Sequence, residues 1–160
     1  KRQVFNGFKN KPFSLANYKI LKSHITFKYL FKRLVKETDP EKWKMLIQLV
    51  KETNAKICIS SVWKNHFKTD DDWNKALDLL GFPQNTYVGR TPNRRTIRGE
   101  EIKEWILEKG NELYIRSVEN YAIIDDDSDM LPEQMHHFFQ TDNYVGLTPT
   151  ICYKIEKHFT

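Results

Sequence analysis

Two short apolar segments, each followed at once by polar residues, constrain the fold of this chain most strongly. The first covers residues 56–60 and the second covers residues 121–124. Short apolar runs rich in β-branched side chains are typical of strands that are buried on both faces of a sheet. Helical patterns separate the two runs, so we expect parallel pairing with right-handed crossovers. The sequence therefore predicts an α/β domain with a doubly wound, mostly parallel sheet and helices on both faces.

Capping residues and apolar stripes locate the helices around these strands. Each expected helix begins at a Ser/Thr/Asp cap, a proline or acidic residues, and two of them end at a glycine. The predicted helices cover residues 40–53, the segment between Thr69 and Gly81, residues 98–109 with Gly110 at the end, and the segment from Pro149 onward. Weaker signals predict strands at 87–88 and 137–140 and a polar loop at 89–95.

Length and composition indicate one compact domain. The chain has 160 residues, of which 39% are hydrophobic and 13% aromatic, enough for a sizeable core. No apolar run approaches the roughly 20 residues of a membrane-spanning helix, and no signal-peptide pattern follows Lys1. Cys58 and Cys152 have no spacing typical of a metal site. We therefore expect a cytoplasmic protein without membrane contact.

Charge is distributed very unevenly along the chain. Residues 1–36 contain ten basic side chains and no acidic one, whereas the other 124 residues hold 16 basic and 21 acidic side chains. The overall charge of +5 therefore combines a segment of +10 with a remainder of −5. Such asymmetry favours a polyanionic partner, and RNA or DNA contact through residues 1–36 is one hypothesis.

Two interpretations of this basic segment are open. Basic side chains interleaved with aromatic ones are what proteins use to bind single-stranded nucleic acid. Alternatively, the segment forms an amphipathic helix whose lysines only face water. The apolar stripe of that helix would be Phe27, Leu30, Phe31 and Leu34, and its exposed lysines would be Lys28, Lys32 and Lys36.

Polar side chains gather where the two clearest strands end. Ser60 and Ser61 end the first strand, and four aspartates at 125, 126, 127 and 129 follow the second. In a doubly wound sheet, ligands bind beyond the carboxyl ends of the strands. Four carboxylates so close together repel one another unless cations compensate. Mg²⁺, which prefers carboxylate oxygen and keeps waters for a phosphate substrate, is the natural candidate.

Each of these clusters also has a simpler interpretation. The acidic run is compatible with a helix N-terminus capped by Ser128 or Asp129. The serines are compatible with ordinary hydrogen bonding at the end of a strand. An EF-hand loop is excluded, because its required glycine would be Met130 and its glutamate would be His136.

Three segments in order, residues 56–64, 98–106 and 121–131, carry a family resemblance. They are similar to the second, third and fourth motifs of the haloacid dehalogenase (HAD) superfamily. The closest similarity is to the compact HAD domain of Swiss Army Knife RNA repair proteins. The resemblance covers roughly residues 38 to 160, and residues 124–132 are its most specific part. It implies a HAD-like, Rossmann-like fold.

The same resemblance implies a phosphohydrolase that acts on a phosphomonoester through an aspartyl-phosphate. Ser60 would hydrogen-bond a phosphoryl oxygen, with Ser61 as the alternative if the strand ends one residue later. Arg98, where the family more often has lysine, would neutralise charge on the transferring phosphoryl group. Lys103 is the alternative for that role.

The aspartates would hold the metal ion of such an enzyme. The resemblance implies that Asp125 and Asp126 bind Mg²⁺, directly or through water, and that Asp129 orients the site from behind these ligands. The ion would offset charge on the phosphate and the nucleophile together.

One part of the family pattern has no counterpart in this sequence. The first motif is an apolar strand ending in Asp-x-Asp, which supplies the nucleophile, and no Asp-x-Asp occurs before residue 70. A truncated N-terminus or an inactive homologue would explain this, and the start at Lys1 favours truncation. Residues 1–38 would then be a basic, aromatic-rich insertion or small cap, and residues 39–160 a HAD-like core lacking its first strand.

These observations leave three hypotheses of different classes. The first is a Mg²⁺-dependent HAD phosphatase that acts on a nucleotide or a terminal phosphate of RNA or DNA. The second is a catalytically inactive HAD-like module that binds nucleic acid. The third is a structural or interaction domain that uses neither cluster. The sequence leaves the oligomeric state open.

Overall fold

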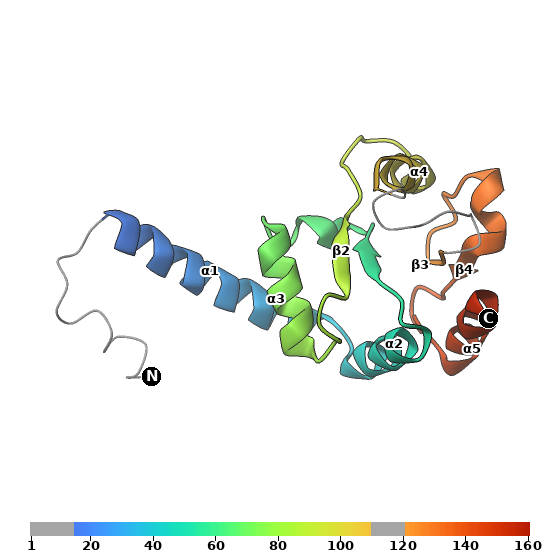
Figure 1. Ribbon diagram of the computed structural model, residues 1–160, viewed down its shortest axis with the longest axis horizontal. Helices are drawn as coiled ribbons and strands as arrows, with labels where there is room; N and C mark the ends of the chain where they lie inside the picture. Colours follow the sequence, from blue (N-terminus) through green and yellow to red (C-terminus); the bar gives the residue numbers. More distant parts are fainter. Residues whose placement is uncertain (1–14, 110–120) are drawn as a thin grey trace.

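The computed structural model describes residues 15–109 and 121–160, with side chains from residue 26 onward in these ranges. Helices and short strands alternate along the chain (Figure 1). The elements, with η for 3-10 helices, are α1 (Leu15–Glu37), α2 (Pro40–Thr53), β1 (Ile57–Ile59), η2 (Val62–Asn65), α3 (Asp70–Leu80), β2 (Tyr87–Arg90), α4 (Arg98–Lys109), β3 (Ile123–Asp125), η4 (Pro132–His137), β4 (Phe138–Gln140) and α5 (Pro149–Phe159).

The strands pair in parallel, as the sequence predicts, but they form two separate pairs. β1 pairs with β2, with Ile59 opposite Arg90 and a bulge after Ile57. β3 pairs with β4, with Asp125 opposite Gln140. Among the described residues, no strand joins the two pairs into one sheet.

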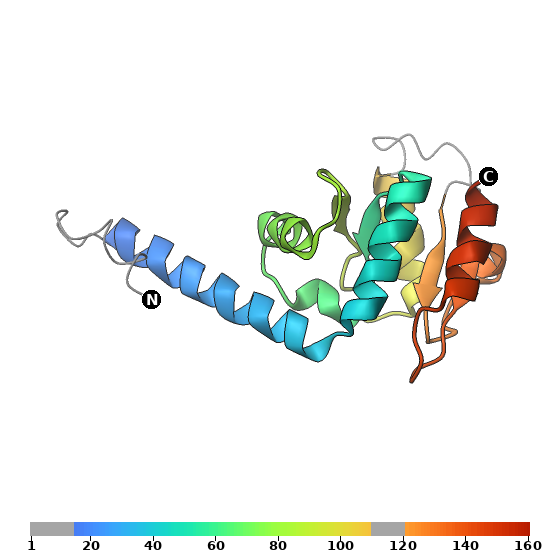
Figure 2. The same cartoon turned by 90° about the horizontal axis from the view of Figure 1, so that it is seen from below.

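Helices cover both sides of the strand layer, which gives an α/β architecture. α4 lies on one side, whereas α2 and α5 contact each other on the opposite side (Figures 1 and 2). Across the layer the strands follow the order β2, β1, β3, β4 (Figure 1). β1 and β3 are therefore the inner strands of the two pairs.

The helix ends confirm the capping signals in the sequence. Asp39 accepts the backbone N–H of Glu41 at the start of α2, and Thr69 accepts that of Asp72 at the start of α3. Gly81 ends α3 in the left-handed conformation, with a φ of 99°, which glycine adopts without steric cost. These contacts join residues at most four positions apart in the sequence, so the helix boundaries are defined locally.

The largest apolar cluster joins α1 to α3. Phe27 and Leu34 of α1 are buried against Phe67, Trp73 and Ala76. The rings of Phe27 and Phe67 are stacked with their centroids 5.4 Å apart. The predicted apolar stripe of this helix is therefore confirmed, and Lys28, Lys32 and Lys36 are exposed as expected.

Two sequence predictions need correction. β1 is half-buried along its length rather than buried on both faces, and among the described residues it has a partner strand on one edge only. β2 continues through Gly89 to Arg90, so the expected loop at 89–95 begins later than predicted. Gly110 and residues 1–14 lie outside the described residues. No described helix has the length and apolar character needed to cross a membrane.

Candidate phosphate site at the N-terminus of helix α4

The two serines after β1 differ in their local roles. The Ser61 hydroxyl oxygen accepts the backbone N–H of Trp63 at 3.2 Å and thereby caps η2. Ser60 is half-buried, and its hydroxyl has no hydrogen-bond partner among the described residues. The Ser61 hydroxyl keeps its own proton to donate, but Ser60 is the serine whose hydroxyl has no role in the local structure of the described residues.

Arg98 and Asp125 form an ion pair at the end of β3. Arg98 is the first residue of α4, and its Nη1 donates to Oδ2 of Asp125, the last residue of β3. The side chains are only 16% and 4% exposed. Burial by itself lowers the pKa of Arg98, but the hydrogen bond and charge of Asp125 outweigh it and the pKa is raised. The guanidinium therefore stays charged at any physiological pH.

The other residues of the aspartate loop, as we name residues 125–129, surround this ion pair. Asp127 donates its backbone N–H to Oδ1 of Asp125 at 3.0 Å, and its own Oδ2 lies 3.9 Å from Nη2 of Arg98. Asp126 has an exposed side chain, and its backbone carbonyl accepts a hydrogen bond from Nε2 of Gln140 at 2.9 Å. Both oxygens of Asp125 are thus engaged, whereas the carboxylate of Asp126 faces outward.

Asp129 holds the first turn of α4. Its Oδ2 accepts the backbone N–H of Arg98 at 2.9 Å, and its carbonyl accepts that of Gly99 at 3.1 Å. These are two of the N–H groups that a helix N-terminus leaves without intrahelical partners. The aspartate loop therefore does cap a helix. The capped helix is α4, about 30 residues earlier in the sequence, and not a helix that follows the loop.

A second buried ion pair, between Lys64 and Glu101, was not anticipated from the sequence. Lys64 Nζ donates to Glu101 Oε2, to the carbonyl of Pro92 at 2.7 Å and to Thr91 Oγ1 at 3.2 Å. Glu101 Oε1 also accepts the backbone N–H of Arg94 at 2.8 Å. Buried charges persist only when they are paired and hydrogen-bonded in this way.

Taken together, the two ion pairs make the first turn of α4 a bridge between the strand pairs. Arg98 and Glu101 are three residues apart, one turn of the helix. Arg98 contacts the end of β3, and Glu101 contacts η2, which follows β1. The segments after β1 and β3 therefore lie at the same helix N-terminus.

Lys103, the alternative to Arg98, points to a different partner. Its Nζ lies 2.9 Å from Oε1 of Glu133 in η4, and both side chains are about half exposed. Arg98 is the basic side chain that contacts the aspartate loop. This geometry favours Arg98 for the phosphate role and leaves Lys103 as the alternative.

The described residues do not complete a metal centre. No group of three or more His, Cys, Asp or Glu side chains able to hold an ion occurs in the part of the chain that the structure describes. Asp125 and Asp126 offer oxygen ligands suited to Mg²⁺, but Arg98 already pairs with Asp125. A metal ion here needs further ligands.

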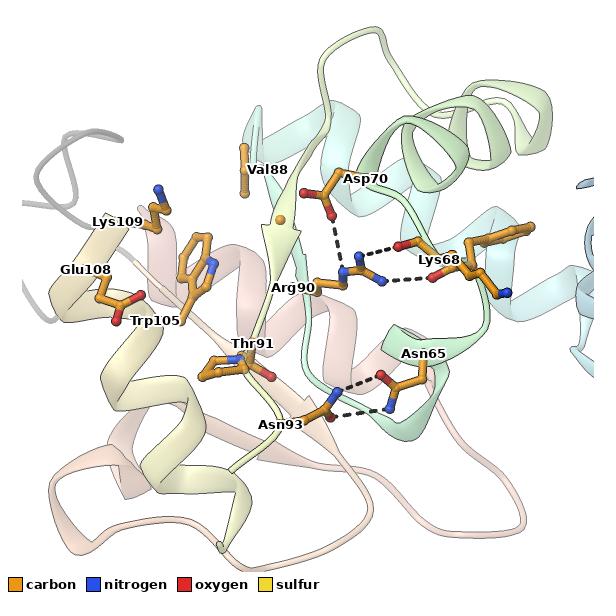
Figure 3. A pocket seen from close by; sticks show the side chains of 13 residues that line it. Asn65, Lys68, Asp70, Val88, Arg90, Thr91, Asn93, Trp105, Glu108 and Lys109 are labelled. Atoms are coloured by element: carbon orange, nitrogen blue, oxygen red, sulfur yellow. Dashed lines mark hydrogen bonds and ion pairs between the residues drawn. The ribbon is translucent and has the colours of Figure 1, made fainter. Parts of the chain in front are cut away.

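A cavity of about 740 Å³ lies beside β2 (Figure 3), and Thr91 and Pro92, which accept hydrogen bonds from Lys64, are part of its lining. Trp105 lines it, and a Cβ on Gly89 would lie 3.2 Å from the indole Nε1. Arg90 also lines it, but its guanidinium donates to the carbonyls of Lys64, Phe67 and Lys68. Neither serine, nor Arg98, nor any of the aspartates at 125–129 lines the cavity.

Parallel strands flanked by helices define an α/β domain, and two buried ion pairs gather polar residues at the N-terminus of α4. The chain matches the family described as HAD domain in Swiss Army Knife RNA repair proteins over residues 19–151. This match covers most of the chain, which therefore belongs to this family and has its HAD-like α/β fold. Searches of the curated proteins and of the solved structures found no match.

Proposed function

We propose that this protein is a Mg²⁺-dependent HAD phosphatase that removes a phosphate from a nucleotide or from the end of a nucleic acid. The bridge made by the first turn of α4 carries the proposal, because it gathers the segments after β1 and β3 at one helix N-terminus. The dipole of a helix N-terminus and the charge of an adjacent arginine both attract phosphate. The backbone N–H groups of Arg98 and Gly99 stay with Asp129. Membership of a HAD family supports the same chemistry.

The proposed phosphate ligands are Ser60 and Arg98. The Ser60 hydroxyl donates to a phosphoryl oxygen, since it has no other partner among the described residues. The Arg98 guanidinium moves part of its hydrogen bonding from Asp125 to the phosphate, which is a strong acceptor for charged donors. Asp129 keeps the backbone of Arg98 in place. Ser61 and Lys103 remain the alternatives.

Asp125 and Asp126 are the proposed Mg²⁺ ligands in this chain, with the remaining ligands supplied from outside the described residues. When bound, the ion would offset negative charge on the phosphate. Asp125 would then exchange one cation, the Arg98 guanidinium, for another. For this exchange, the Arg98 guanidinium must turn from Asp125 to the phosphate when the phosphate binds.

The nucleophile of the proposed reaction is an aspartate of the first family motif. We place its strand between β1 and β3, the inner strands in Figure 1, where it would join the two pairs into one doubly wound sheet. The first aspartate of the Asp-x-Asp motif attacks phosphorus and the ester P–O bond breaks. The leaving oxygen takes its proton from the second aspartate of that motif, which acts as the general acid. Water then hydrolyses the aspartyl-phosphate and releases inorganic phosphate.

The test is phosphate release from a phosphorylated RNA oligonucleotide by the protein expressed with any residues encoded upstream of Lys1. We expect Asp125→Asn to lower the rate by about 10²–10³ and a chelator to abolish it until Mg²⁺ is restored. Asp78→Asn, an exposed aspartate of α3, is the matched control and should keep the wild-type rate. Full activity in chelator and in Asp125→Asn would refute the proposal.

A second candidate is a HAD-like module that binds nucleic acid without chemistry. Two observations favour it: no Asp-x-Asp occurs before residue 70, and Asp125 is neutralised by Arg98 in the described residues. Salt-dependent binding of single-stranded RNA with no phosphate release from any substrate would select this candidate.

A further inference from the structure

We infer that the outward face of α1 is a binding surface for single-stranded nucleic acid. This inference rests on the nucleic-acid substrate of the proposed function and assigns the surface that holds it. The basic face, as we name it, consists of Lys28, Tyr29, Lys32, Arg33 and Lys36. All five side chains are exposed.

Helical geometry places these five side chains together. At about 100° per residue, they span roughly 140° of the helix circumference. Phe27 and Leu34 are buried on the other side, against Phe67 and Trp73 of the core. His66 Nε2 also lies 2.7 Å from the carbonyl of Leu30 and ties α1 to η2. The helix cannot rotate without breaking this packing, so the basic face is fixed toward solvent.

The charges of the basic face are largely uncompensated. Arg33 pairs with Glu37 at 2.7 Å. Lys28, Lys32 and Lys36 have no ion-pair partner in the described parts of the chain. Lysines four residues apart follow the helix axis at about 6 Å intervals and form a row of point charges. Such a row suits a chain of phosphates.

Tyr29 distinguishes this face from a merely solvated one. It is a large aromatic side chain, 67% exposed, and it lies beside the row of lysines, one helical turn before Arg33. Exposed aromatic rings within a basic groove or stripe stack on unpaired bases, which duplexes do not offer. α1 also projects from the rest of the domain in both views (Figures 1 and 2).

The experiment is fluorescence anisotropy of a labelled 12-nucleotide RNA that carries no terminal phosphate. Three lysine contacts predict a slope of about −2 in log affinity against log salt, roughly a 20-fold loss between 50 and 200 mM. We expect Lys28→Glu/Lys32→Glu to weaken binding at least tenfold and Tyr29→Ala at least fivefold. Lys51→Glu/Lys154→Glu changes the same net charge at exposed sites of α2 and α5 and should bind as wild type.

Equal binding of single-stranded DNA supports the inference, because the proposed contacts are to phosphates and to the flat rings of the bases, which RNA and DNA share. It is overturned if the α1 variants bind as wild type, if the control pair loses as much affinity, or if only duplexes or anionic vesicles bind. Thermal melting of each variant separates lost binding from lost folding. Since no phosphate is released in this assay, its outcome is independent of the phosphatase test.

Discussion

The guanidinium of Arg98, at the first position of α4, contacts the carboxylate of Asp125, at the last position of β3. This contact joins the start of a helix to the end of a strand 27 residues later in the sequence. It also places a permanent positive charge where parallel strands end, the usual location of ligands in α/β folds. The same pair is therefore important for both the fold and the proposed site.

Removing one partner of this pair should destabilise the domain strongly. Arg98→Gln leaves the Asp125 carboxylate buried without its cation, which typically costs about 3–5 kcal/mol. The double variant Arg98→Gln/Asp125→Asn removes both charges and should recover much of that loss. Urea unfolding of the wild type, both single variants and the double variant measures this. Additive losses would show that the two side chains do not interact.

Gly99 is predicted to tolerate no side chain. A Cβ at this position would lie 2.6 Å from both the backbone nitrogen of Leu131 and Oε1 of Gln134. Gly99→Ala should therefore push α4 away from the segment after Asp129 and cost about 1–3 kcal/mol in urea unfolding. Leu107→Ala, at an exposed position of the same helix, should change stability by less than about 0.5 kcal/mol. Equal effects of the two substitutions would contradict this packing.

Cys58 should make the stability of the domain depend on alkaline pH. Burial raises the pKa of its thiol to about 12, from an ordinary value near 9.0. Because the folded-state pKa is the higher one, the stabilisation is complete below pH 9 and is lost as the pH rises toward 12. Between pH 7.5 and 10 the wild type should lose about 1 kcal/mol more unfolding free energy than Cys58→Ala. Parallel losses in both proteins would exclude this titration.

The helices were predictable because their boundaries depend on neighbouring residues. The caps at Asp39 and Thr69 act within three positions along the chain, so the sequence alone located α2 and α3. The first residue of each polar cluster was predictable for a similar reason, because it is the first polar residue after an apolar run. Ser60 and Asp125 were identified in this way.

Contacts between distant segments were not predictable. Lys64 and Glu101 are 37 residues apart, and each resembles an ordinary surface charge in the sequence. Their proximity to predicted site residues was the available signal, since Lys64 follows Ser60 by four positions and Glu101 follows Arg98 by three. The separation of the strands into two pairs depends on backbone pairing that no local pattern encodes.

The most direct test of the account asks whether the ends of β1 and β3 act on one phosphoryl group. It compares kcat/KM for Ser60→Ala, Asp125→Asn and the double variant, in the protein with any residues encoded upstream of Lys1. Groups that act as a unit give strongly non-additive losses. We predict that each single variant loses about 10²–10³ in kcat/KM and that the double variant falls little further. A wild-type rate in either single variant, or losses that multiply in the double variant, would contradict a shared site.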